Sequence, residues 1–198
     1  MRLSLIPLLL VAALAVVGPS RAAEKPSKIK VLLVTGDDVA PAHDWLEVAT
    51  ATRAILDESG RFEVRVSEDA GILDSERSLQ RYVVVYLAMY NAHTPTLSDT
   101  AKANLLGFVR GGKGFVVTHL SSASFKEWSA FRELCGRVWV MGKSGHGPRS
   151  VFEVKVVDPS HPITAGMADF EADDELYAKL QGDAPIHVLA TSDSDWSK

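Results

Sequence analysis

Cysteine and positive charge are both scarce in this 198-residue sequence. Its single cysteine, Cys135, excludes a disulfide within the chain. The 21 lysines and arginines are outnumbered by 25 acidic residues, which gives a formal net charge of −4. A chain of this charge lacks the basic surface that binds a phosphate backbone, so nucleic acid is not an expected partner. Stability must come from packing, and 46% hydrophobic residues are enough for one core.

Long hydrophobic runs are also missing, apart from one at the amino terminus. Residues 3–17 are almost all apolar and follow Arg2, and small residues surround Ser20, Arg21 and Ala22. This run is short for a membrane span and typical of a secretory signal peptide. We therefore predict a signal peptide over residues 1–22, a periplasmic or secreted product, and no membrane span after cleavage. A retained amino-terminal anchor is the alternative.

The rest of the chain alternates between two kinds of hydrophobic pattern. Apolar and β-branched runs predict buried parallel strands, and stripes with a 3.6-residue period predict amphipathic helices between them. The expected strands are 28–35, 62–66, 82–90 and 114–118, and the expected helices follow Asp44, Ser98 and Ser124. Such alternation favours an α/β protein, flavodoxin-like, with three α/β/α layers and a mostly parallel sheet. Residues 23–27 are expected to be a short linker and 28–198 one domain.

The pattern becomes less regular after Gly136. A glycine-rich segment precedes an expected strand over 151–158, and the acidic segment 168–180 is expected to hold a short helical turn. A last strand is expected over 186–191. An open α/β domain usually packs a helix behind such a strand, so the sequence predicts that the domain is truncated at its carboxyl terminus. An extended chain is accordingly expected to be more stable.

Histidines follow three of the predicted parallel strands. His43 comes after the first strand, His93 after the third and His119 after the fourth. Ligands of open parallel sheets bind outside the carboxyl ends of the strands, so these rings are expected to converge on one crevice. His146 lies in a glycine-rich loop that can fold over that crevice. For any one histidine, an ordinary surface or hydrogen-bonding role is the simpler interpretation.

The stretch GGKGFVVTHLSSASF (111–125) places His119 at a strand-to-helix turn. Turns of this kind hold a reactive side chain at the edge of the sheet. The only thiol, Cys135, falls instead on the apolar stripe of the next predicted helix, where a cysteine packs as a small hydrophobe. Ser121 and Ser122 lie outside any G-x-S-x-G turn, which argues against a serine hydrolase.

Several stretches resemble the ThuA-like (trehalose-utilisation) family of the class I glutamine amidotransferase-like superfamily. They are GDDVAPAHDW, LLGFVRGGKGFVVTHLSS, WSAFRELCGRVW, GHG and, most specifically, VVDPSHPITAGMADFEADDELY, which holds Asp174, Glu175 and Tyr177. Amidotransferases carry a nucleophilic cysteine at the turn where this sequence has His119. The resemblance therefore implies that the chain is not a cysteine-dependent glutamine amidotransferase.

The resemblance also implies a role in carbohydrate catabolism. The implied substrate is a small carbohydrate such as trehalose or a 3-keto-disaccharide, and a sugar dehydrogenase is the implied partner. A neutral imidazole can accept and return a proton near neutral pH, with a carboxylate to orient it. We expect His119, Glu175 and His43 to be catalytic, and we expect a second set to bind substrate: His93, His146, Asp174 and Tyr177.

Two questions stay open at this stage. The first is whether a divalent metal is bound, because imidazole and carboxylate suit zinc or manganese, but no HxH or HExxH spacing is present. The second is whether the chain is an enzyme or a non-catalytic sugar-binding or interaction domain. An enzyme is expected to place His119 and Glu175 in one pocket. A binding domain is expected to line a cleft with aromatic rings such as Tyr90, Trp139 or Tyr177 and to disperse its histidines.

Overall fold

A computed structural model describes residues 27–39 and 41–193 of the chain. The predicted signal peptide, most of the linker and residues 194–198 lie outside the described residues. Within the part described, no helix is both long enough and apolar enough to cross a membrane.

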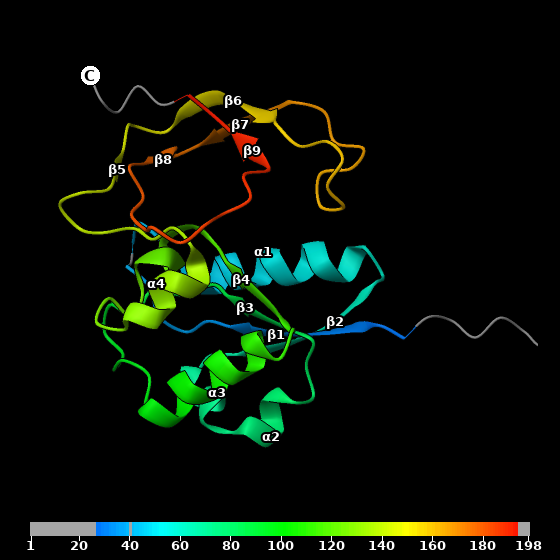
Figure 1. Ribbon diagram of the computed structural model, residues 1–198, viewed down its shortest axis with the longest axis vertical. Helices are drawn as coiled ribbons and strands as arrows, with labels where there is room; N and C mark the ends of the chain where they lie inside the picture. The colour runs from blue at the N-terminus through cyan, green and yellow to red at the C-terminus, as the bar shows by residue number, and fades with distance from the viewer. Residues whose placement is uncertain (1–26, 40, 194–198) are drawn as a thin grey trace, which may run out of the picture.

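A four-stranded parallel sheet forms the centre of the molecule (Figure 1). Its strands are β1 (Ile29–Val34), β2 (Phe62–Ser67), β3 (Val84–Leu87) and β4 (Gly114–Val117). Their order is β2-β1-β3-β4, and β1 is central, pairing Val31 with Val64 on one side and with Val84 on the other. The predicted α/β class and mostly parallel sheet are confirmed, and all four predicted strands form.

Helices pack on both faces of this sheet, as expected for a three-layer arrangement. They are α1 (Trp45–Glu58), α2 (Glu76–Leu79), α3 (Asp99–Arg110) and α4 (Ser129–Cys135), with 3-10 turns η1 (Ala70–Asp74) and η2 (His119–Ala123). The predicted caps form: the Asp44 carboxylate accepts from the amides of Leu46 and Glu47, and the Ser98 hydroxyl accepts from the amide of Ala101. Capping of this kind satisfies amides that have no partner inside the helix.

The core is divided by the sheet into two unequal parts. The larger part packs Leu32, Val34 and Val85 of the sheet against Leu105 of α3 and Phe131 of α4. The smaller part packs Leu33 and Ala88 against Ala49 of α1. Successive residues of a strand point to opposite faces, which is why Leu32 and Leu33 belong to different parts of the core.

The helix predicted from Ser124 begins later than expected. Ser124 ends η2, and α4 begins only at Ser129. The Ser124 side chain is buried, and its hydroxyl donates to the carbonyl of Met89 at 2.9 Å, so it is not available to cap a helix. A long-range hydrogen bond to the end of β3 has therefore taken the place of the predicted local one.

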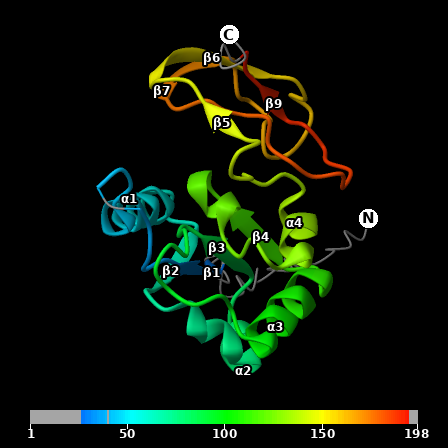
Figure 2. The same cartoon turned by 90° about the vertical axis from the view of Figure 1, so that its left-hand side faces the viewer.

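The carboxyl-terminal third forms separate antiparallel sheets and does not extend the parallel one. One contains β6 (Ser150–Val156), β7 (Phe170–Asp174) and β9 (Ala190–Thr191) in the order β7-β6-β9, and the other pairs β5 (Gly145–His146) with β8 (Tyr177–Ala178). These strands lie beyond α1, on the side of the parallel sheet opposite α2 and α3 (Figures 1 and 2). The helical turn expected over 168–180 was wrong, because that segment supplies β7 and β8. The last strand, expected over 186–191, is limited to two residues.

Candidate functional site

His119 stands at the turn where β4 ends and η2 begins. Its φ angle is +48°, in the left-handed region that non-glycine residues rarely enter. Strain of this kind persists only where the surrounding structure holds it, and it is concentrated at active sites and ligand-binding turns. The predicted strand-to-helix turn is therefore present, with an unusual backbone at the residue expected to be functional.

Buried hydroxyl groups hold this turn against the end of β3. The backbone amide of Met89 donates to Ser121 Oγ at 2.9 Å, and Ser124 Oγ donates to the Met89 carbonyl at the same distance. Thr118 Oγ1 donates to the Leu87 carbonyl at 3.3 Å. The serines that follow His119 thus fix the position of the turn and are not aligned as nucleophiles.

His43 reaches the same place from the end of β1. The segment that carries it leaves the strand at Gly36, whose φ is +114° and where an added Cβ would lie 1.9 Å from the Glu68 carbonyl oxygen. Only glycine allows this close approach. Asp44 then starts α1, and the ring of His43 meets the ring of His119 edge-on, with centroids 4.8 Å apart.

The remaining site residues come from the antiparallel strands that cover this edge. The Tyr177 ring stacks on the His119 ring with centroids 4.5 Å apart, and its hydroxyl lies 3.2 Å from His119 Nε2. His146 of β5 pairs with Tyr177 of β8 across the small sheet, and its Nε2 lies 3.6 Å from Glu175 Oε2. One side-chain nitrogen or oxygen from each of His43, His119 and Glu175 lies within 4.8 Å of the others.

The surroundings of His119 favour its uncharged form. Burial lowers the pKa of the His119 imidazole below its ordinary value, and the neighbouring His43 lowers it further, although Asp174, Glu175 and Asp38 act in the opposite direction. Burial, together with Glu175 and Asp174, raises the pKa of the Tyr177 hydroxyl, which therefore stays protonated at neutral pH. His119 is thus a neutral base in contact with a protonated phenol.

His93 does not join this cluster. Its side chain is 79% exposed, and its Nδ1 lies 3.2 Å from Asp37 Oδ1. The Asp37 carboxylate also accepts hydrogen bonds from the amides of His93 and Thr94. Burial acts to raise the pKa of Asp37, but these hydrogen bonds outweigh it and lower the pKa. Among the described contacts none links His93 to His43 or His119, so the structure does not bring His93 into the cluster.

The charges of Asp174 and Asp38 each act to raise the pKa of the His119 imidazole. Asp174 is exposed at the end of β7, where its carboxylate accepts from the amide of Glu175. Asp38 follows β1 and was not among the residues predicted to form the site. Its position after a central parallel strand, at the same edge as His43, was the signal that could have found it.

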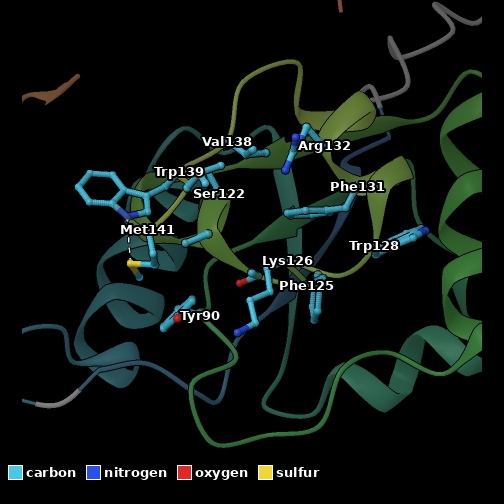
Figure 3. Close-up of a pocket in the computed structure, with 13 residues that line it drawn as sticks. Tyr90, Ser122, Phe125, Lys126, Trp128, Phe131, Arg132, Val138, Trp139 and Met141 are labelled. Carbon is cyan, nitrogen blue, oxygen red and sulfur yellow. Dashed lines mark hydrogen bonds between the residues drawn. The ribbon is translucent and has the colours of Figure 1, made fainter. Parts of the chain in front are cut away.

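A cavity of about 300 Å³, drawn in Figure 3, adjoins the cluster through Trp139. Its lining includes Tyr90, Phe125, Trp128, Phe131, Lys126, Arg132, Trp139 and Met141. Trp139 connects the two features, because its ring lies 4.5 Å from the Tyr177 ring and 5.9 Å from the His146 ring. Tyr90 and Trp139 thus line a cleft as expected for sugar binding, but His43 and His119 are gathered and not dispersed.

Cys135 is not placed to act as a nucleophile. It ends α4, partly buried against the larger core, and burial raises the pKa of its thiol to about 12. We predict that a thiol reagent at pH 8 modifies the folded protein about 10³ times more slowly than the urea-unfolded chain, because the thiolate is the reactive form. Reaction rates with and without urea test this. A folded-state rate within tenfold of the unfolded one would contradict it.

Comparisons with other proteins agree with this architecture. A ThuA-like protein from Parabacteroides merdae superposes with a TM-score of 0.73 at 24% identity, over 86% of this chain and 70% of that one. A ThuA-like protein from Bacteroides uniformis has a TM-score of 0.63 at 20% identity, over 81% of this chain and 64% of that one. At these identities the likeness establishes the fold alone. No curated protein sequence matches significantly.

The sequence profile of one family covers nearly the whole described domain. Residues 30–198 match the ThuA family, whose description is trehalose utilisation. The match includes all the residues of the cluster at the end of the parallel sheet. The chain therefore belongs to the ThuA (trehalose utilisation) family.

Proposed function

We propose that this protein is an exported enzyme of disaccharide catabolism that acts through the cluster around His119. Family membership supports a role related to trehalose utilisation. The observation that carries the finer proposal is the approach of His43, His119 and Glu175 to within 4.8 Å, from three separate segments of the chain. A merely structural histidine would not need a second histidine and a carboxylate beside it.

The cavity beside the cluster is the proposed binding site for the sugar. A pyranose ring has apolar C–H faces and polar hydroxyl edges, so it suits a pocket with aromatic walls and a few charged groups. Tyr90 and Trp139 supply such walls, and Lys126 and Arg132 supply hydrogen-bond donors. Because Trp139 also contacts Tyr177 and His146, a sugar lying on Trp139 would reach the cluster.

The proposed chemistry is proton transfer at a carbon next to a carbonyl group. In a 3-keto-disaccharide the carbonyl acidifies the neighbouring C–H bonds, and a partner sugar dehydrogenase would supply such a substrate. His119 would accept the proton as a neutral base, while the protonated Tyr177 hydroxyl would donate a hydrogen bond to the developing enolate oxygen. Return of the proton to the departing glycosidic oxygen would complete an elimination.

The aromatic lining also fits a non-catalytic sugar-binding domain, and turnover distinguishes the two. We expect the protein to convert 3-keto-trehalose and to leave trehalose unchanged, as measured by chromatography of the products. Binding of both sugars without conversion of either would favour the binding domain. Failure to bind or convert either sugar would contradict the proposed substrate class.

Removal of the Trp139 ring should weaken substrate binding more than the chemical step. For Trp139→Ala we predict a KM increase of about 3–10-fold with little change in kcat, because the lost contact is made equally in the ground state and the transition state. Trp139→Phe, which keeps an aromatic face, is the matched control and should stay close to wild type. A fall in kcat for Trp139→Ala without a change in KM would place the sugar elsewhere.

A further inference from the structure

The cluster contains the ligand types of a divalent metal site. His43, His119 and Glu175 each offer one ligand atom within 4.8 Å of the other two. Two imidazoles and one carboxylate form a donor set that suits zinc or manganese and leaves coordination positions open for water or substrate. The residues are separated by more than 50 positions in the sequence at each step, so local spacing could not have revealed the set.

His146 lies next to the carboxylate of this set. Its Nδ1 lies 2.6 Å from the Gly147 carbonyl oxygen, which can only accept, so Nδ1 carries a proton. In the neutral ring Nε2 is then an acceptor, yet it faces another acceptor, Glu175 Oε2, at 3.6 Å. A second proton on the His146 ring, which would form an ion pair with Glu175, or a cation beside Glu175 would each resolve this mismatch. Histidines that bind metal commonly donate their other ring N–H to a carbonyl in this way.

Tyr177 provides the same kind of outer hydrogen bond for His119. Its hydroxyl lies 3.2 Å from His119 Nε2. In the tautomer with Nε2 protonated, His119 donates to the phenol oxygen and leaves Nδ1 as the free ligand atom. The stacked Tyr177 ring also fixes the plane of the imidazole, with centroids 4.5 Å apart.

We propose that His43, His119 and Glu175 bind one zinc-type divalent ion, with His146 facing the carboxylate from its other side. Metal–ligand bonds of about 2.0–2.1 Å in a tetrahedral site separate ligand atoms by about 3.3 Å. The three ligand atoms lie within 4.8 Å of one another, so binding an ion requires them to approach by at most about 1.5 Å. The proposed metal site is inferred from the positions of the ligand atoms and does not depend on which substrate is bound.

Zinc titration of the tag-free, chelator-treated protein tests the proposal without any sugar. Isothermal titration calorimetry should detect one zinc ion per chain, and zinc should raise the midpoint of thermal unfolding. His43→Gln, His119→Asn and Glu175→Gln should each weaken zinc binding at least tenfold. His146→Gln should weaken it less, because His146 acts on the carboxylate and not on the ion.

His187→Gln is the matched control. His187 forms another histidine–carboxylate pair, with Nε2 2.7 Å from Asp158 Oδ2, and no contact among the described residues joins it to the cluster. This variant should bind zinc like wild type. Absence of one-to-one binding, or binding that survives in the His43, His119 and Glu175 triple variant, would overturn the metal site. Because the readout is zinc alone, its failure would leave the sugar proposal standing. Zinc bound through His119 Nδ1 would leave no free nitrogen on that ring to accept a proton, so His119 would then hold the ion and another group would have to act as the base.

Discussion

Replacement of His119 by asparagine should lower the turnover of an accepted sugar by a factor of about 10²–10⁴, the usual contribution of a general acid or base. The His119 ring contacts both His43 and Tyr177, so its loss removes the centre of the cluster. Asparagine cannot accept and return a proton at neutral pH. The loss should fall on kcat and on kcat/KM alike, because the proton transfer occurs only in the transition state.

Asparagine is a better replacement than alanine because of the backbone at this position. With φ at +48°, alanine would keep the left-handed strain of about 1–2 kcal/mol that a Cβ atom causes, whereas asparagine enters that region readily. Loss of activity in His119→Asn can then be separated from loss of folding. His119→Gly, which is relaxed at this φ, is a second control and should be equally inactive but folded.

Steady-state kinetics on 3-keto-trehalose and urea unfolding of the same samples measure both effects. Glu175→Gln should also lower turnover, because its carboxylate lies beside the histidines. Full activity in His119→Asn would make the histidine structural and would place the chemistry elsewhere in the domain. Unfolding of both His119→Asn and His119→Gly would mean that the ring is needed for packing and not for catalysis.

The parallel sheet could be predicted because each of its strands carries its own signal. β1 is apolar except for Lys30 and is buried from Val31 to Val34, and the caps at Asp44 and Ser98 mark the helices that follow. Burial on both faces selects such residues whatever the partner strand is. Local pattern and final structure therefore agree in this half of the chain.

Most of the antiparallel strands gave weaker signals, because β5, β8 and β9 have two residues each and β7 is largely exposed. The longer β6 is the exception, since its alternating pattern predicted a strand over 151–158. β7 has the sequence FEADD, which holds one apolar residue of strand-forming type and three acids. It becomes a strand only because β6 pairs with it, joining Phe152 to Ala172 and Val154 to Phe170. Pairing between distant segments overrides local preference here, and no single-segment pattern contains that information.

Only the site residues that follow the parallel strands could be predicted from the sequence pattern. The rule that strand ends meet at one edge brought His43 and His119 together, but it also included His93, which hydrogen-bonds with Asp37 instead. Glu175 and Tyr177 come from the antiparallel part and were selected only through the family resemblance. Nothing local indicated that β8 would stack Tyr177 on His119.

Replacement of Phe131 by alanine should have the largest effect on stability, a loss of about 3–5 kcal/mol in the free energy of unfolding. The side chain is 2% exposed, and its ring meets Phe125 at 5.3 Å, Trp128 at 6.0 Å and Phe115 at 6.3 Å between centroids. Phe131 packs α4 against the sheet and also lines the proposed sugar cavity. Truncation would leave a void that rigid aromatic neighbours cannot fill.

Phe131→Leu is the matched control, because it keeps most of the apolar volume and should cost well under half as much. Urea unfolding followed by tryptophan fluorescence measures both variants, and an unchanged m-value would show that the change lies in stability alone. Phe131→Ala should reduce sugar binding only through the altered cavity, since the ring contacts of Phe131 among the described residues are with Phe115, Phe125 and Trp128 and not with the histidine cluster. A loss below about 1.5 kcal/mol for Phe131→Ala would mean that α4 can move to fill the void left by the phenyl ring. The sugar cavity would then be deformable and not preformed.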